Sequence, residues 1–233
     1  MKLLPVMLTL LASLFFGPEA HSRELVVAVS PYMEPEAAKK QAKDVLKFLT
    51  ELEPGDKATI LDGYHLSLIR EWITPENPAY NSPKARLGLN RKVVSSLLGF
   101  ASKATVPGGS GQPSITGALR LPQLLRHIAR NFRTDSCMQD IVILGSPLYE
   151  DLDTPALSMT NERYPSDGHL IASPGITPYG TSGNSDGLWG FRIHIGYGSQ
   201  GMTGTDRHDY FVQRFWTLFI EHQGGTLASF VED

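Results

Sequence analysis

Two short, uninterrupted apolar runs, Leu25–Val29 and Ile141–Leu144, constrain the fold of this chain more than any other feature. Neither run alternates with polar residues, as a strand with one solvated face would. Both therefore predict strands that are buried on both faces of a sheet. Sheets of this kind are covered by helices on both sides, and their strands are mostly parallel.

Amphipathic helices are predicted between the strands. The first opens at Glu34–Glu36, where acidic residues and a proline suit the first turn, and it ends at Pro54. Ser82 can cap the next helix, with Pro83 in its first position. Further helices are predicted over Leu119–Phe132 and from Asp206 or Asp209 to Ile220, and further strands over Phe191–Ile195 and Thr226–Val231. This alternation predicts an α/β fold of three layers (α/β/α) around a mostly parallel central sheet.

One pair of strands departs from the parallel pattern. The segments Ala58–Leu61 and Tyr64–Ile69 are strand-like, and Asp62-Gly63 joins them. An Asp-Gly pair tolerates the positive φ angles of a two-residue hairpin turn. We therefore predict an antiparallel hairpin with that turn, which places one antiparallel strand at an edge of the sheet.

Residues 1–22 have the pattern of a secretory signal peptide. Lys2 precedes the apolar run Leu3–Phe16, and Ala20–Ser22 offers small residues for cleavage. The run is shorter than the roughly 20 residues of a membrane-spanning helix, and no later segment is apolar for longer. We expect an exported protein, periplasmic or extracellular, without a membrane span after cleavage. Residues 23–233 then form a single domain.

Composition narrows the classes of partner. A formal net charge of −3 gives no electrostatic reason to expect nucleic acid or an anionic membrane. The single cysteine, Cys137, cannot form an internal disulfide, and we expect it to be buried beside a strand. The segment from about 150 to 187 is rich in Pro, Gly, Ser, Thr and Asp. We interpret it as a loop-rich insertion, a kind of segment that is usually functional or mobile.

Nucleotide-binding and hydrolase motifs are incomplete. The glycines at 196–201 have a dinucleotide-binding spacing but open no helix, and Gly108–Gly111 lacks the Lys-Ser/Thr of a phosphate loop, so no cofactor is predicted. Ser30 and Ser146 each follow a buried strand, as a nucleophilic serine does, but neither is flanked by glycines on both sides. A serine hydrolase that uses Ser30 or Ser146 with a histidine from another loop stays open as an alternative.

Metal-binding patterns are also sparse. The sequence holds no His-x-x-x-His pair, and its acidic groups at 206–209 and 150–153 are the segments that could attract a cation. Asp151 and Asp153 are the weak candidate ligands, although a helix start or a solvated loop is the favoured interpretation of both acidic groups. No metal site is predicted from the residues alone.

The order of these elements resembles a von Willebrand factor A domain. That order is a buried strand, a long helix, an Asp-Gly hairpin, two helices, a strand, an insertion, a strand, a helix and a strand. The phrases that carry the resemblance lie at Val26–Met33, Leu49–Leu61, Ser114–Ala129, Asp140–Pro147, Phe191–Gly198 and Phe219–Phe230. The resemblance spans about residues 24–233 apart from the insertion.

The metal-dependent adhesion site of that family uses an Asp-x-Ser-x-Ser loop, a Thr in a second loop and an Asp after the fourth strand. The resemblance carries these positions, in that order, onto Ala28, Ser30, Tyr32, Thr116 (or else Ser114) and Ser146. Both carboxylates are therefore absent. Hydroxyl groups alone should hold a cation such as Mg²⁺ poorly, so the resemblance implies a degenerate metal site.

These observations favour a non-catalytic module that binds a protein partner or serves as a scaffold, as an accessory component of a bacterial envelope or secretion assembly. The candidate binding residues around the strand ends are Ser30, Tyr32, Thr116, Ser146 and Tyr149. Tyr164 and Tyr179 of the insertion are further candidate anchors. Besides the hydrolase, a cation-dependent adhesion domain with Asp151 or Asp153 as substitute ligands stays open as an alternative.

Overall fold

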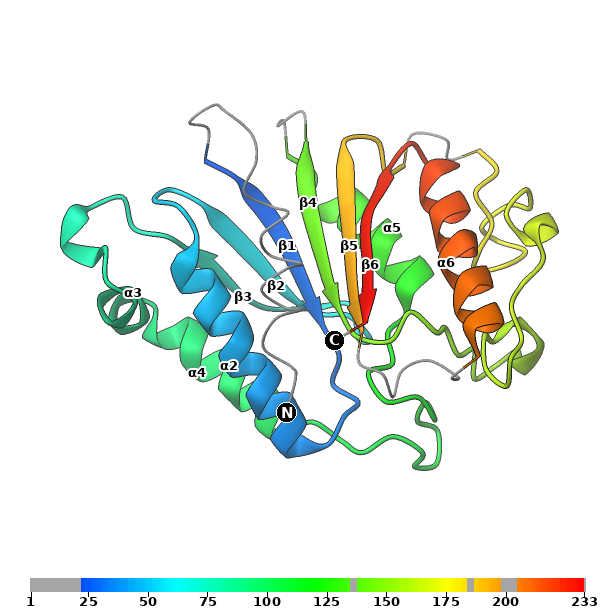
Figure 1. Cartoon of the computed structure of the whole chain (residues 1–233), viewed down its shortest axis with the longest axis horizontal. Helices are drawn as coiled ribbons and strands as arrows, with labels where there is room; N and C mark the ends of the chain where they lie inside the picture. The colour runs from blue at the N-terminus through cyan, green and yellow to red at the C-terminus, as the bar shows by residue number, and fades with distance from the viewer. Residues whose placement is uncertain (1–21, 135–137, 184–186, 198–204, 233) are drawn as a thin grey trace.

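A computed structural model describes residues 22–134, 138–183, 187–197 and 205–232 (Figure 1). Its centre is a six-stranded sheet with the strand order β3-β2-β1-β4-β5-β6. The strands are β1 (Glu24–Val29), β2 (Lys57–Asp62), β3 (Ser67–Ile73), β4 (Gln139–Leu144), β5 (Phe191–Tyr197) and β6 (Thr226–Glu232). All neighbouring pairs are parallel except β2 and β3. The predicted α/β class and its antiparallel edge strand are confirmed.

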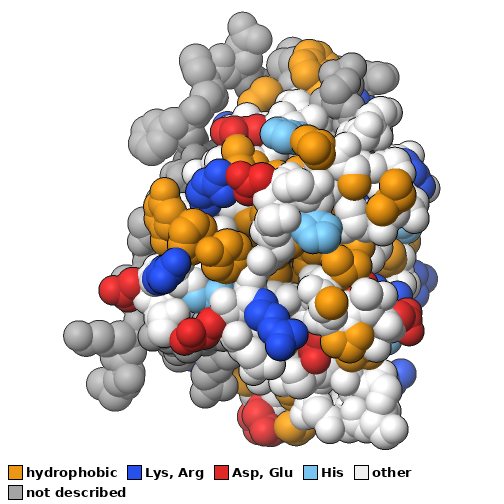
Figure 2. Space-filling model, turned by 90° about the vertical axis from the view of Figure 1, so that its right-hand side faces the viewer, with side chains coloured by type: hydrophobic (Ala, Val, Ile, Leu, Met, Phe, Trp, Pro, Cys, Tyr) orange, Lys and Arg blue, Asp and Glu red, His pale blue; other side chains and the backbone are white. Residues whose placement is uncertain are grey.

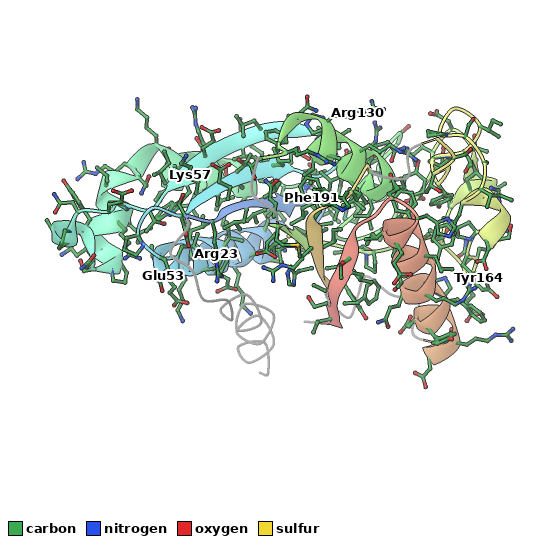
Figure 3. All side chains as sticks on the ribbon, turned by 90° about the horizontal axis from the view of Figure 1, so that it is seen from above. Arg23, Glu53, Lys57, Arg130, Tyr164 and Phe191 are labelled. Atoms are coloured by element: carbon green, nitrogen blue, oxygen red, sulfur yellow. The ribbon has the colours of Figure 1, made fainter. Side chains whose placement is uncertain are left out.

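Helices cover both faces of this sheet. They are α2 (Pro35–Glu51), α3 (Pro83–Leu89), α4 (Arg91–Ser102), α5 (Leu121–Asn131) and α6 (Asp206–Glu221). Seen from above, α5 with Arg130 lies on one side of the sheet and α2 on the other (Figure 3). As predicted, Ser82 caps α3: its hydroxyl accepts a hydrogen bond from the amide of Ala85, and Pro83 occupies the first turn.

Each of the central strands contributes to two separate hydrophobic cores. In β1, Val26 and Ala28 pack in the core beneath α5 and α6, whereas Leu25, Val27 and Val29 pack beneath α2 and α4. Successive side chains of a strand point to opposite faces, so a strand between two helical layers must be apolar throughout. This position between two helical layers explains why the run Leu25–Val29 is apolar at every residue.

The hairpin between β2 and β3 differs from the prediction in its turn. Four residues, 63–66, connect the strands instead of two, and β3 begins at Ser67 instead of Tyr64. The positive φ angle lies at Leu66 (57°). The carboxylate of Asp62 accepts hydrogen bonds from the amides of Tyr64 and His65, and these bonds stabilise the longer turn.

The helix predicted after Ser82 is divided into α3 and α4 at Asn90. The side-chain amide of Asn90 donates to the carbonyl of Arg86, and Asn90 has a non-helical ψ angle of 31°. Asparagine side chains compete for backbone groups in this way and thereby end helices.

The insertion is anchored to the domain in the part that the structure describes. It contains two short 3₁₀ turns, η2 (Pro155–Leu157) and η3 (Asp167–His169); a third, η1 (Pro78–Tyr80), precedes α3. Tyr179 is fully buried in the core beneath α5 and α6, and Arg126 of α5 donates to the carbonyls of Pro178 and Gly180. Tyr179 therefore belongs to the core and is not available as a surface anchor, whereas Tyr164 is 40% exposed.

The outer face of the insertion and α6 presents apolar side chains to solvent. Ile171 is 73% exposed and Ile176 is 78% exposed. Tyr164 of the insertion stacks on Phe211 of α6, with 4.4 Å between ring centroids. Figure 2 shows several groups of hydrophobic side chains on this side of the molecule, separated by charged and polar ones.

Three predictions lie on residues outside the described ones: most of the signal peptide at 1–22, the burial of Cys137, and most of the glycine motif at 196–201. Within the ranges that the structure describes, no helix has the length and apolar character needed to cross a membrane.

Candidate binding site at the strand ends

Three loops meet beyond the carboxyl ends of β1 and β4. The hydroxyl of Ser30 donates to the carbonyl of Ala118 (2.7 Å) and accepts from the amide of Tyr32 (3.0 Å). The amide of Gly117 donates to the carbonyl of Tyr32 (2.6 Å), and the amide of Ser146 donates to the carbonyl of Gly117 (2.7 Å). The loops around Ser30, Thr116 and Ser146 are thus hydrogen-bonded to one another, as parallel strands with adjacent ends require.

Two glycines permit this close approach. Gly117 has a φ angle of 77°, and a Cβ atom there would lie 3.0 Å from the amide nitrogen of Ser146. A Cβ atom on Gly145 would lie 2.7 Å from the carbonyl oxygen of Gly117 and equally close to Leu119. Neither position has room for a side chain without displacing backbone or a core residue.

The two candidate serines are fully buried, with 1% of each residue exposed. Both hydrogen bonds of the Ser30 hydroxyl go to backbone groups, and the Ser146 hydroxyl accepts from the amide of Leu148 (3.1 Å). A nucleophilic serine needs an accessible oxygen and a base within reach. The geometry of Ser30 and Ser146 instead fits hydroxyls that fix the conformation of the loops.

An aromatic layer lies beside these loops. The rings of Tyr32 and Tyr64 meet edge to face at 4.7 Å, and the guanidinium of Arg120 lies 4.8 Å from the centre of the Tyr64 ring. Burial raises the pKa of Tyr32, and Tyr64 and Asp62 raise it further, whereas Arg120 lowers it. His65 also contacts the Tyr64 ring, and its Nδ1 atom lies 2.8 Å from the Asp62 carboxylate.

No sequence motif marked Tyr64, His65 or Arg120 as site residues. The hairpin turn carries the first two toward the loops, and Arg120 immediately precedes α5. The available signal was the position of the hairpin turn at the carboxyl end of β2, on the same edge of the sheet as Ser30.

Tyr149 is held in place by side-chain hydrogen bonds. It is buried, its hydroxyl accepts from the side-chain amide of Gln123 (3.1 Å), and it donates to one carboxylate oxygen of Asp151 (3.2 Å). Burial raises the pKa of Tyr149 to about 12, and Asp151 contributes in the same direction. The Tyr149 hydroxyl therefore remains protonated at neutral pH.

The acidic residues of this region stabilise turns. The other carboxylate oxygen of Asp151 accepts from the amides of Asp153 (3.1 Å) and Thr154 (2.8 Å), while Asp153 itself is exposed. Glu150 accepts from the amide (2.6 Å) and the hydroxyl (3.0 Å) of Ser114. Among the described residues, no three His, Cys, Asp or Glu side chains are grouped so that they could hold a metal ion.

Buried groups thus form the base of the site, and exposed groups form its surface. Thr116 is half-buried, and His65 and Arg120 are exposed. We name these three residues the mouth surface. Beneath it lie Tyr32 and Tyr64, which are 8% and 5% exposed.

Searches with this chain against protein-family models, curated proteins and solved structures found no match. What the structure establishes is an α/β fold with a mostly parallel, six-stranded sheet. It also establishes that the loops at the carboxyl ends of β1 and β4 are hydrogen-bonded to the loop around Gly117.

Proposed function

We propose that this chain is an exported, von Willebrand factor A-like module that binds a protein partner or serves as a scaffold, without catalysis at the strand ends. One observation carries the proposal: the Ser30 and Ser146 hydroxyls, which the resemblance assigns to a metal site, are buried and bonded to backbone beneath the exposed mouth surface. Rigid surfaces of this kind bind with a smaller loss of conformational entropy.

The residues at the two aspartate positions support binding without a shared metal ion. Ala28 is fully buried, and Ser146 is buried with its hydroxyl bonded to the Leu148 amide. Mg²⁺ is held in proteins mainly by carboxylates and water, and neither residue supplies a carboxylate.

The arginine of the mouth surface supports the proposal of protein binding. Arginine and tyrosine are the side chains most enriched among residues that dominate binding energy, and Arg120 rests on the ring of Tyr64. The exposed apolar residues Ile171 and Ile176 of the insertion offer a second contact area to a scaffold partner.

Site-specific crosslinking in the producing cells tests this proposal. A photoreactive amino acid at Thr116 should give one discrete crosslinked species, which Arg120→Glu should abolish and EDTA should leave intact. The matched control is the same amino acid at Lys92, an exposed residue of α4. Sensitivity to EDTA, or the same species from both positions, would contradict the proposal.

Export is tested separately by the mass of the mature protein. Cleavage after residue 22 should give a chain that begins at Arg23 and is recovered from the envelope or the medium. Recovery of the uncleaved chain from the cytoplasm would contradict export.

A further inference from the structure

Three neighbouring strands carry a chain of polar side chains that the proposed function does not use. Asp140 lies on β4, His194 on β5 and Ser229 on β6. The Nδ1 atom of His194 lies 3.0 Å from the Ser229 hydroxyl, and its Nε2 atom lies 3.4 Å from the Asp140 carboxylate. We name these three residues the β4–β6 relay.

The strand register places the relay on the α2 side of the sheet. Val142 lies two residues after Asp140 on β4, so the two side chains point to the same face of the sheet. Val142 packs in the core beneath α2 and α4. His194 is paired with Val142, and Ser229 is paired with His194. A bulge between β5 and β6 brings Ser229 opposite His194 in place of Ala228. Without that irregularity the serine would point to the other face of the sheet.

The relay combines two buried titratable residues with a half-buried serine. Asp140 and His194 are 7% and 3% exposed, whereas Ser229 is only half-buried and lies on an edge strand. In Figure 1, α2 and α4 lie toward the β3 end of the sheet, and β5 and β6 lie toward the other end. Because β6 is an edge strand, one side of it has no neighbouring strand in the described sheet.

Arg192 completes the cluster. One of its terminal nitrogens lies 2.7 Å from the second oxygen of Asp140, and its side chain is 33% exposed. Its Nε atom is buried and has no hydrogen-bond partner in the described structure. A buried donor without a partner is costly, and such donors recur where a ligand or a developing charge supplies the acceptor.

Asp140 can hold the imidazole in the orientation that catalysis needs. Burial alone would raise the pKa of Asp140, but hydrogen bonds from His194 and Arg192 outweigh it and hold the pKa below its ordinary value. An ionised Asp140 can accept a hydrogen bond from a protonated Nε2 of His194. The Nδ1 atom of His194 is then unprotonated and can accept the proton of Ser229. The distance of 3.4 Å is long, as catalytic hydrogen bonds often are without substrate.

We propose that the β4–β6 relay is an acyl-transfer site that hydrolyses small carboxylic esters, with Ser229 as the nucleophile and His194 as the base. The Ser229 oxygen attacks the ester carbonyl while its proton moves to Nδ1 of His194, and Asp140 acts as a positioning residue. The alkoxide leaves with that proton as an alcohol. Water then attacks the acyl-serine while its proton moves to His194, and His194 returns that proton to the Ser229 oxygen as the acyl–serine bond breaks, which releases the carboxylic acid and the free serine. The ion pair with Arg192 helps to keep Asp140 ionised throughout.

The nucleophile of the relay is not the one in the serine hydrolase alternative that the sequence suggested. Ser30 and Ser146 are buried and bonded to backbone, whereas Ser229 is bonded to an imidazole. The activity also lies outside the mouth surface. The relay and the mouth surface share no residues, so ester hydrolysis and partner binding can be tested independently.

The experiment uses the whole exported protein, p-nitrophenyl acetate as substrate and a fluorophosphonate as covalent probe. The probe should modify Ser229, identified by peptide mass, and Ser229→Ala should lower ester hydrolysis about 10²-fold or more. Ser102→Ala, in an exposed serine of α4, is the matched control and should keep full activity. His194→Gln should abolish labelling, and Asp140→Asn should lower kcat without changing KM.

The result that overturns the proposal is hydrolysis that persists in Ser229→Ala, or a probe that leaves Ser229 unmodified in the wild-type protein. The second measurement needs no variant, so it remains decisive even where a substitution in the sheet prevents folding.

Discussion

The loops at the strand ends and the β4–β6 relay both contain buried polar residues, but their hydrogen bonds go to different partners. At the strand ends, the hydroxyls of Ser30 and Ser146 are bonded to backbone groups. In the relay, the Ser229 hydroxyl is bonded to His194, which is bonded to Asp140. A hydroxyl bonded to backbone fixes a loop, whereas a hydroxyl bonded to a titratable side chain can exchange its proton. The partner, more than the residue type, indicates the role.

The two regions also differ in how they respond to change. The strand-end loops depend on close backbone contacts, so substitutions there should lower stability. The relay lies partly on an edge strand, so its serine should be replaceable with little loss of stability and a large loss of chemistry. The following predictions test this contrast, from the largest expected effect on stability to the smallest.

The largest loss is expected for Gly145→Ala. The new methyl group would lie 2.7 Å from the Gly117 carbonyl oxygen and from Leu119, so the loops must separate. We expect the free energy of unfolding to fall by about 3 kcal/mol, measured by urea denaturation. Gly175→Ala is the control because its Cβ meets no atom within 4 Å. Equal stability of the two variants would show that the loops are not tightly packed.

Ser30→Ala should have the next largest effect. It leaves the Ala118 carbonyl and the Tyr32 amide without their buried partner. The expected loss is about 1–3 kcal/mol, the cost of unsatisfied buried groups. Ser229→Ala should cost less than Ser30→Ala in the same denaturation experiment, because Ser229 is half-buried. The reverse order would refute the contrast between the two regions.

Asp140 should give stability a component that depends on pH. Because the folded state holds its pKa below the ordinary value, its contribution is fully present above the unfolded pKa of about 3.9. The contribution is lost as the pH falls from there through the folded pKa, by up to about 1.4 kcal/mol for each pH unit. Asp140→Asn should remove that component from melting curves recorded between neutral and acidic pH. If the melting temperature of Asp140→Asn fell with acid as steeply as that of the wild type, Asp140 would not be ionised in the folded state.

The smallest effect is expected for the ion pair between Asp167 of η3 and Arg214 of α6. Two hydrogen bonds of 2.9 and 2.7 Å join them, but both side chains are largely exposed. Asp167→Asn should lower the melting temperature less than Asp140→Asn does, and the difference from wild type should disappear in about 0.5 M salt. A decrease that persists in salt would mean that this pair anchors the insertion more strongly than exposed pairs usually do.

The sequence predicted the layers of the fold and the meeting of its loops because these depend on local patterns. The apolar runs at 25–29 and 141–144 determined that two helical layers must enclose the strands. Ser82 with Pro83 determined where a helix starts. The convergence of the Ser30, Thr116 and Ser146 loops followed from parallel strand order. Partner binding at those loops stays a prediction.

Other features were decided only by the tertiary structure. The break at Asn90, the burial of Tyr179 and the approach of Arg120 to Tyr64 depend on contacts that no local pattern contains. The relay joins residues from three strands, and a single bulge determines that Ser229 faces His194. A shift of one residue in register turns a side chain to the opposite face of a sheet. The amino-acid sequence therefore supplied the serine, the histidine and the aspartate, but only the strand register brought them into contact.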